Sequence, residues 1–179
     1  MSGRRFRGAN ILLHVYDLNA VNSVSYDFGI GVFHSGVEIA GTEYTFGGHE
    51  SSGSGIFNHA PKEAPNAQFR VTIDMGETDK SNSDINAEIA SLGSHFTGDS
   101  YHIVLKNCNH FSNELCLRLT GKAIPRWVNR LAGYGSLVSC ILPKNLGVKN
   151  PESADIQNQS TMGPSYTPFA GAGMALSQA

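Results

Sequence analysis

The chain has 179 residues, of which 40% are hydrophobic and 16% are charged, and its formal net charge at pH 7 is -2. This length and composition predict one globular domain with a hydrophobic core. The lack of a basic excess argues against a nucleic-acid partner, and no apolar run approaches the ~20 residues that a membrane-spanning helix needs.

Short apolar or alternating segments in the first half of the chain predict β-strands. They are residues 10–17, 30–34, 37–40, 43–46 and 69–73. Ser35 and Gly36 are interpreted as a turn between the second and third segments, and Gly47 and Gly48 as the end of the fourth. Residues 50–65, rich in Ser, Gly and Pro, predict a loop that borders a cleft.

The apolar residues then recur at the spacing of helices. Residues 81–84 (SNSD) have the form of a capping box and predict the start of one helix. Residues 101–105 (YHIVL) predict a further strand, followed by a helix that begins at Cys108 and ends at Gly121. Pro125 is expected to open a short helix over residues 125–132. The apolar residues expected on the packed helix faces are Ile85, Ile89, Leu92, Phe96, Phe111, Leu115, Leu119, Trp127 and Leu131.

Strands precede helices along the chain, which favours the α+β class over an alternating α/β fold. We expect a flexible N-terminal arm over residues 1–9, a folded domain over residues 10–144 and a disordered tail over residues 145–179. The tail has few large apolar residues and is rich in Ser, Gln, Asn, Gly and Pro. Because no segment resembles a signal peptide, a cytoplasmic or nuclear location is expected.

The sequence contains three cysteines, Cys108, Cys116 and Cys140. Their odd number and the lack of CxxC spacing argue against a disulfide framework and against a structural zinc site. We therefore expect three free thiols, no metal and no cofactor.

Cys108 stands where a strand-like run gives way to a helix, in the segment KNCNHFSNELC. A thiol at a helix N-terminus meets unpaired N–H groups and the positive end of the helix dipole, which lower a thiol pKa and favour the nucleophilic thiolate. Asn107 either caps this helix, the preferred interpretation, or donates a hydrogen bond to a reaction intermediate.

A cysteine nucleophile needs a base, and imidazole has a suitable pKa. His34 is the best candidate because it lies in a strand between small residues, although a buried structural histidine fits its position equally well. His110, two residues after Cys108, is expected to bond at the helix start instead. The remaining histidines are expected in the core, on the surface or beside the loop; they are His14, His49, His59, His95 and His102.

Three blocks, GIGVFHSGVEIAGTEYTFGGHE, YHIVLKNCNHFSNEL and IPRWVNRLA, resemble the permuted papain-fold peptidases of double-stranded RNA viruses and eukaryotes (PPPDE). The resemblance covers about residues 10–143. It implies a circularly permuted papain-like fold, with an antiparallel sheet packed against helices. It also implies a catalytic dyad of His34 and Cys108, in which His34 forms an ion pair with the thiolate and protonates the leaving amine.

The family includes isopeptidases, so the resemblance implies removal of SUMO or ubiquitin from protein lysines. Gly47 and Gly48 are either ordinary turn residues or the lining of a slot for the Gly-Gly tail of such a modifier. A third catalytic group is not evident; Asp17 is the nearest acidic candidate, and a dyad is preferred.

Two other functions remain open. Lecithin:retinol acyltransferase-like proteins also carry an NC-x-HF block like the NCNHF of this chain, so a protein S-acyl thioesterase or a lipid acyltransferase using the same pair is an alternative. The third possibility is a binding module that retains the fold without activity.

Overall fold

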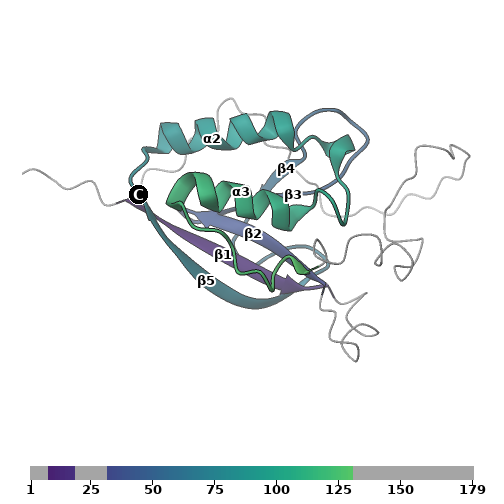
Figure 1. Cartoon of the computed structure of the whole chain (residues 1–179), viewed down its shortest axis with the longest axis horizontal. Coiled ribbons are helices and arrows are strands. Elements are labelled where there is room, and N and C mark those ends of the chain that lie inside the picture. Colours follow the sequence, from purple (N-terminus) through teal and green to yellow (C-terminus); the bar gives the residue numbers. More distant parts are fainter. Residues whose placement is uncertain (1–7, 19–31, 131–179) are drawn as a thin grey trace, which may run out of the picture.

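The computed structural model describes residues 8–18 and 32–130, which form an α+β fold, as the sequence predicts. Five strands make one antiparallel sheet in the order β4-β3-β2-β1-β5, and helices cover one of its faces (Figure 1). The elements are β1 (Ala9–Asp17), β2 (Phe33–Ile39), β3 (Thr42–Phe46), β4 (Ile56–His59), β5 (Gln68–Thr78), α2 (Asn82–His95), the short 3-10 helix η2 (Gly98–Ser100) and α3 (Cys108–Thr120). Most of the expected arm and all of the expected tail lie outside the described residues.

The sheet is built around the pairing of β1 with β2, which runs from Ile11 opposite Ile39 to Asp17 opposite Phe33. Alternate side chains of β1, those of Ile11, Leu13 and Val15, are fully buried in the hydrophobic core. Because side chains alternate along a strand, the residues between them lie on the opposite face of the sheet. That second face also buries polar side chains, among them His14 and the tyrosine Tyr16.

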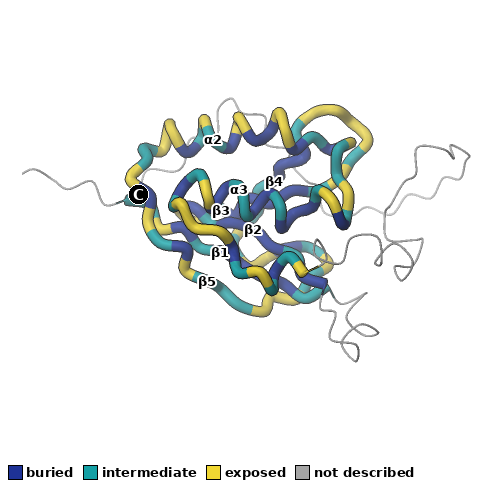
Figure 2. Tube along the Cα trace, viewed as in Figure 1, coloured by how far each residue is buried: buried dark blue, intermediate teal, exposed yellow. Residues whose placement is uncertain are grey.

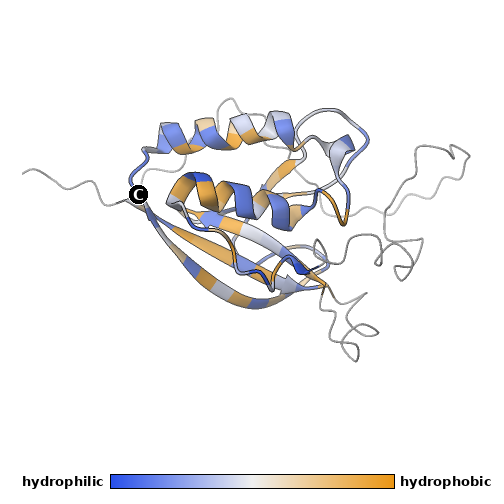
Figure 3. Ribbon diagram, viewed as in Figure 1, coloured by the Kyte–Doolittle hydropathy of each residue, from blue (hydrophilic) through white to orange (hydrophobic). Residues whose placement is uncertain are grey.

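Helix α3 lies between the sheet and α2 and buries one side against each (Figures 1 and 2). Its core residues include Leu115 and Leu119, and α2 contributes Ile85, Ile89 and Leu92. Apolar residues accordingly follow the inner side of α2 and the strands (Figure 3). The apolar spacing therefore predicted the packed faces of both helices correctly.

Both predicted helix ends are confirmed. Ser81 caps α2 and exchanges hydrogen bonds with Asp84, which is the predicted capping box. At the other end of α3, Gly121 has a left-handed backbone (φ 72°) and its N–H donates to Leu117. Glycine adopts that conformation without the steric cost that a side chain imposes.

The predicted turn at Ser35 and Gly36 is wrong. Both residues continue strand β2, opposite Val15 and His14 of β1. The chain reverses instead at Ala40 and Gly41, which both have positive φ angles (48° and 78°), as a two-residue hairpin turn requires. A Cβ atom at position 36 would overlap the side chain of Glu43, so close packing explains this glycine.

Two further predictions need correction. Residues 50–65 are not a continuous loop, because β4 (Ile56–His59) pairs with β3 and buries Ile56. Residues 101–105 are not a strand: His102 and Lys106 form an isolated bridge that closes a turn. The His102 ring accepts hydrogen bonds from two backbone N–H groups inside this turn, which stabilises it without a neighbouring strand.

The segment after Pro125 forms a turn in its described part, where Val128 N–H donates to the Pro125 carbonyl. The rest of the predicted helix, including Leu131, lies outside the described residues. Trp127 packs edge-to-face against Phe33 at a centroid distance of 5.2 Å, so its expected packing role is confirmed. None of the described helices is long and apolar enough to span a membrane.

Two leucines of α3 provide a matched test of this packing. Leu115 is fully buried and Leu117 is 39% exposed. We expect Leu115→Ala to lower the free energy of unfolding by about 2–5 kcal/mol, because it removes core contacts and leaves a cavity. Leu117→Ala should cost less than about 1 kcal/mol. Urea denaturation followed by circular dichroism measures both, and equal losses would contradict the assigned packing.

Candidate active site

Helix α3 starts at Cys108, and Asn107 caps it. The Asn107 side-chain oxygen accepts hydrogen bonds from the N–H groups of Asn109 and His110, at 3.0 and 3.2 Å. Its side-chain nitrogen donates to the Ile103 carbonyl at 2.6 Å. The preferred capping role is therefore confirmed, and the amide donor is used in the turn that precedes the helix. His110 completes the cap through its ring, as expected for a residue that bonds at the helix start.

Buried hydrogen bonds of Asn109 fix the start of α3 to strand β2. Its side-chain nitrogen donates to the carbonyls of Phe33 (2.9 Å) and Val128 (3.2 Å). The Ser35 hydroxyl lies 2.7 Å from the Asn109 side-chain oxygen and 2.9 Å from the Ser112 hydroxyl. All of these side chains are buried, so the strand that carries His34 and the helix that carries Cys108 are held together by a satisfied polar cluster.

The Cys108 thiol is almost fully buried, with 4% of the residue exposed. Backbone N–H groups of Ser35, Asn109 and Cys108 itself point at the sulfur, and so does the Tyr101 hydroxyl. These donors favour the thiolate, but burial outweighs them and raises the thiol pKa to about 11. The expected lowering of this pKa is therefore wrong for the structure as it stands, because the helix N-terminus lies in a desolvated site.

The His34 ring lies on the face of the sheet opposite the Ser35 hydroxyl, since neighbouring side chains alternate along β2. Its Nε2 atom is 3.3 Å from the Thr45 hydroxyl, which itself donates to the Ser35 carbonyl at 3.0 Å. Because that hydroxyl has one proton, it accepts from Nε2–H, and none of the hydrogen bonds among the described residues uses the Nδ1 lone pair, which can take a proton. Burial lowers the pKa of His34 to about 4, so the ring is neutral at pH 7.

The backbone of Ser35 links the two candidate residues. Its N–H faces the Cys108 sulfur, and its carbonyl accepts from the Thr45 hydroxyl that holds His34. Among the described residues, no hydrogen bond joins the imidazole directly to the thiol. The structure thus places His34 and Cys108 around one residue of β2 as a neutral imidazole and a neutral thiol, rather than as an ion pair.

Tyr101 is a site residue that the sequence analysis missed. Its hydroxyl hydrogen-bonds to the Cys108 sulfur, and burial raises its own pKa. Gly48 lies against the Tyr101 ring, where an added Cβ would come within 2.9 Å of the tyrosine Cβ. The Gly47-Gly48 segment therefore borders the thiol site through Tyr101. The available signal was the position of a tyrosine seven residues before the cysteine. Because residues 101–105 were interpreted as a strand, Tyr101 was not recognised as a neighbour of Cys108.

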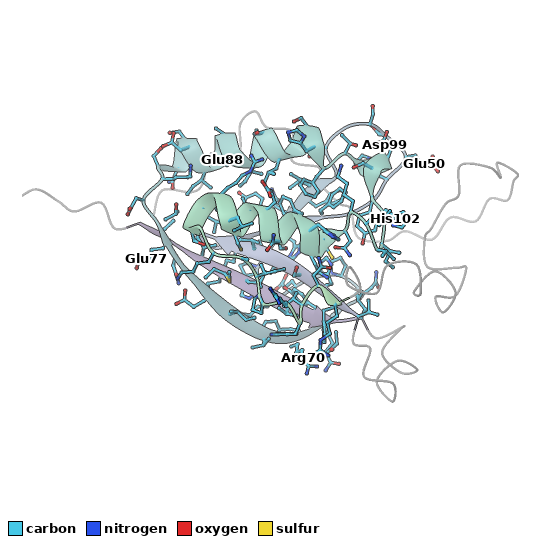
Figure 4. The ribbon with its side chains drawn as sticks, in the orientation of Figure 1. Glu50, Arg70, Glu77, Glu88, Asp99 and His102 are labelled. Carbon is cyan, nitrogen blue, oxygen red and sulfur yellow. The ribbon has the colours of Figure 1, made fainter. Side chains whose placement is uncertain are left out.

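The carboxylate whose charge acts on His34 is Glu43. Asp17 forms an ion pair with Arg70 at 3.1 Å on a partly exposed edge (Arg70 is labelled in Figure 4). Glu43 is fully buried in β3, and its negative charge acts on His34. Sequence patterns do not reveal this, because Glu43 lies nine residues from His34 in another strand and their proximity depends on strand register.

The other histidines have structural or surface positions. His14 is fully buried and bonds to Glu38 (2.6 Å) and Thr72 (2.9 Å), which agrees with its expected core role. His95 ends α2 on the surface. His49 bonds to the Ser54 carbonyl and packs over Gly98. His102 lies at the end of the molecule where α3 begins, near the exposed Glu50 and Asp99, while Glu77 and Glu88 lie away from it (Figure 4).

Cys116, the other described cysteine, is fully buried in the core, where burial raises its pKa to about 12. It is a free thiol, as is Cys108. Cys140 lies outside the described residues. Within residues 8–18 and 32–130, no group of three or more His, Cys, Asp or Glu side chains is arranged to hold a metal ion.

Comparison with known proteins identifies relatives for most of the chain. The family described as "PPPDE putative peptidase domain" matches residues 9–146. The chain is 46% identical over 136 residues to a DeSI-like protein of Arabidopsis thaliana, and 46% identical over 140 residues to the desumoylating isopeptidase 1 homolog of Caenorhabditis elegans. Each match covers 76% of this chain, but 61% and 42% of those two relatives. The DeSI-like protein sdu1 of Schizosaccharomyces pombe is 33% identical over 158 residues, which is 84% of this chain and 79% of that protein.

The Tyr101 hydroxyl offers a direct test of the thiol environment. Tyr101→Phe removes a donor that lowers the Cys108 pKa, so that pKa should rise further above its ordinary value. We expect Cys108 to be alkylated by iodoacetamide about threefold to tenfold more slowly at pH 8, since one pKa unit changes the thiolate fraction tenfold. Intact-mass kinetics measure the rate, and Cys108→Ala identifies the labelled thiol. An unchanged rate in a folded variant would rule out the contact.

Proposed function

Because the chain belongs to the PPPDE peptidase family, we propose that it is a cysteine isopeptidase that removes a ubiquitin-like modifier from protein lysines. The observation that carries this proposal is the placement of Cys108 at the N-terminus of α3, with its sulfur among backbone donors and next to the strand residue that follows His34. The names of the relatives favour SUMO as the modifier, with ubiquitin as the second candidate.

The proposal includes a circularly permuted papain-like arrangement. The histidine strand, β2, precedes the cysteine helix, α3, along the chain. The buried Asn109 cluster joins them, so the two elements act as one unit despite the 74 residues that separate Ser35 from Asn109.

In the first half of the reaction, the Cys108 sulfur attacks the carbonyl carbon of the isopeptide bond. The free Nδ1 atom of His34 takes the thiol proton as the carbon–sulfur bond forms. A neutral starting pair makes this proton transfer part of the attack, in contrast to an ion pair formed in advance. Because the His34 ring lies on the sheet face opposite the Ser35 hydroxyl, the transfer requires the imidazole and the thiol to approach each other when substrate binds, as catalytic contacts that are open without substrate commonly do.

In the second half, the carbon–nitrogen bond breaks, and His34 gives its proton to the departing lysine amine. A water molecule then attacks the thioester carbonyl, His34 takes a proton from the water, and Cys108 leaves as the sulfur anion that is reprotonated. The backbone N–H of Cys108 stabilises the oxyanion in both halves, because it stands at the helix start beside the sulfur.

A modifier with a Gly-Gly tail fits the surroundings of the thiol. Gly48 packs directly on Tyr101, and Tyr101 reaches the sulfur, so the Gly47-Gly48 segment is connected to the thiol site through one side chain. We propose that a slim extended tail lies along the Gly47-Gly48 segment beside Tyr101 and places its carbonyl at Cys108. The free thiols Cys108 and Cys116 are consistent with a reducing compartment, and we propose the cytoplasm or nucleus as the location.

Covalent capture tests the proposal. Pure protein is mixed with SUMO and, separately, with ubiquitin, each carrying a cysteine-reactive group at its C-terminus, and adduct mass is recorded. We expect the SUMO probe to form an adduct with wild type, none with Cys108→Ala, and at least about tenfold slower formation with His34→Ala. His95→Ala, a change at an exposed histidine, serves as the control and should react like wild type.

The outcomes separate the candidate functions. An adduct with ubiquitin alone would identify ubiquitin, and not SUMO, as the modifier and would still support an isopeptidase. No adduct with either probe, from a protein with a native circular dichroism spectrum, would contradict the proposal. Hydrolysis of a fluorogenic thioester by that same preparation would then support the S-acyl thioesterase alternative.

A further inference from the structure

Beneath the loop that follows β4, on the sheet face away from the helices, lies a fully buried carboxylate, that of Glu43. The Tyr16 hydroxyl donates to both of its oxygens, at 2.8 and 2.7 Å. The backbone N–H of Lys62 donates to it at 2.9 Å. The carboxylate also fills the space over Gly36, so it is confined on every side that the structure describes.

The partners of Glu43 indicate that it is ionised. Tyrosine hydroxyl and backbone N–H groups act here as donors, and a carboxylate that only accepts has the hydrogen-bonding pattern of the charged form. A charge buried this deeply needs a nearby group of opposite charge. Among the ion pairs of the described residues, the one that involves Glu43 is with His59, whose Nε2 atom lies 3.9 Å away. That nitrogen is buried and has no hydrogen-bond partner there.

His34 is the second histidine on which the negative charge of Glu43 acts. Its ring packs against Tyr16 at a centroid distance of 5.7 Å, and Thr45, two residues from Glu43 on the same face of β3, holds its Nε2 atom. The Glu43 charge raises the pKa of His34, which opposes the larger lowering caused by burial. Glu38, another carboxylate on this face, is bound to His14 and partly exposed, so its environment differs from that of Glu43.

We propose that Glu43 is a positioning residue whose buried negative charge, held by Tyr16 and the Lys62 amide, stabilises the imidazolium that forms when His34 takes the Cys108 proton. This inference rests on the roles that the proposed function gives to His34 and Cys108. It supplies the acidic third group for which the sequence offered only Asp17. Glu43 does not touch the substrate; it acts through His34.

The ionisable and polar groups that surround Glu43 and His34, Glu43 included, come from four parts of the fold. They are Tyr16 from β1, Glu43 and Thr45 from β3, His59 from β4, and the Lys62 amide from the following loop. Because Tyr16 and His59 both contact Glu43, a change of the glutamate is compared with a change of Glu38, which leaves the Glu43 cluster in place.

The rate of Cys108 alkylation by iodoacetamide between pH 5 and 9 is the test, because it needs no substrate. Glu43→Gln keeps the side-chain volume but removes the charge, so we expect alkylation near pH 7 to slow about tenfold, the effect of removing one nearby opposite charge. Glu38→Gln removes a carboxylate from the same face and should leave the whole pH profile unchanged. Equal profiles for wild type and a folded Glu43→Gln variant would overturn the inference.

Glu43→Asp keeps the inference testable if Glu43→Gln fails to fold. This conservative change retains the negative charge and shortens the side chain by one methylene, so the alkylation rate should stay within about threefold of wild type. A tenfold fall in a folded Glu43→Asp protein would indicate that packing and not charge matters at this position, and would overturn the inference.

The outcome is distinct from that of the capture experiment. Slowed alkylation in Glu43→Gln, combined with no SUMO or ubiquitin adduct in wild type, would support the role of Glu43 and contradict the isopeptidase. Normal alkylation in Glu43→Gln, combined with capture by wild type, would overturn the role of Glu43 and leave the isopeptidase in place.

Discussion

The buried hydrogen bonds of Asn109 are the constraint on which the rest of the candidate site depends. Its side-chain nitrogen donates hydrogen bonds to two backbone carbonyls. Its side-chain oxygen accepts from the Ser35 hydroxyl and, at 3.8 Å, from the Cys108 thiol. Each of these groups lost its water when the helix packed on the sheet. Removing one partner would therefore leave several polar atoms unsatisfied at once, which costs more than the bond itself contributes. The separation of β2 and α3 is set by this requirement.

Burial and the helix N-terminus have opposite effects on the thiol, and burial prevails. A helix start favours an anion, but at Cys108 the same packing that aims N–H groups at the sulfur also removes the water that would solvate a thiolate. The result is an environment that holds a neutral thiol at rest and has donors in place for negative charge. Such a site is expected to react when substrate binds and the thiol proton is transferred. Until then the neutral thiol is protected from oxidation, since the thiolate is the form that oxidises.

Local patterns in the sequence predicted those features that depend on local chemistry. The Ser81 capping box, the Gly121 C-cap, the start of α3 at Cys108 and the strand at residues 10–17 all follow from side chains within a few positions of one another. Features set by contacts between distant segments were missed or misjudged. Ser35 and Gly36 look like a turn, but are small because Asn109 and Glu43 occupy the adjacent space. Glu43 and Tyr101 could not be assigned for the same reason, since one depends on strand register and the other on a turn that brings it back to the helix.

The two-residue hairpin at Ala40 and Gly41 has a consequence far from its own position. Because side chains alternate along a strand, a shift of β2 by one residue relative to its neighbours would exchange the two faces. His34 would then point toward α3, and Ser35 would point toward Glu43, so both polar clusters would be broken together. The length of this tight turn fixes which register is adopted. An inserted or deleted residue at the tip of the hairpin, which touches neither cluster, would therefore disable the site as completely as the loss of one of its side chains.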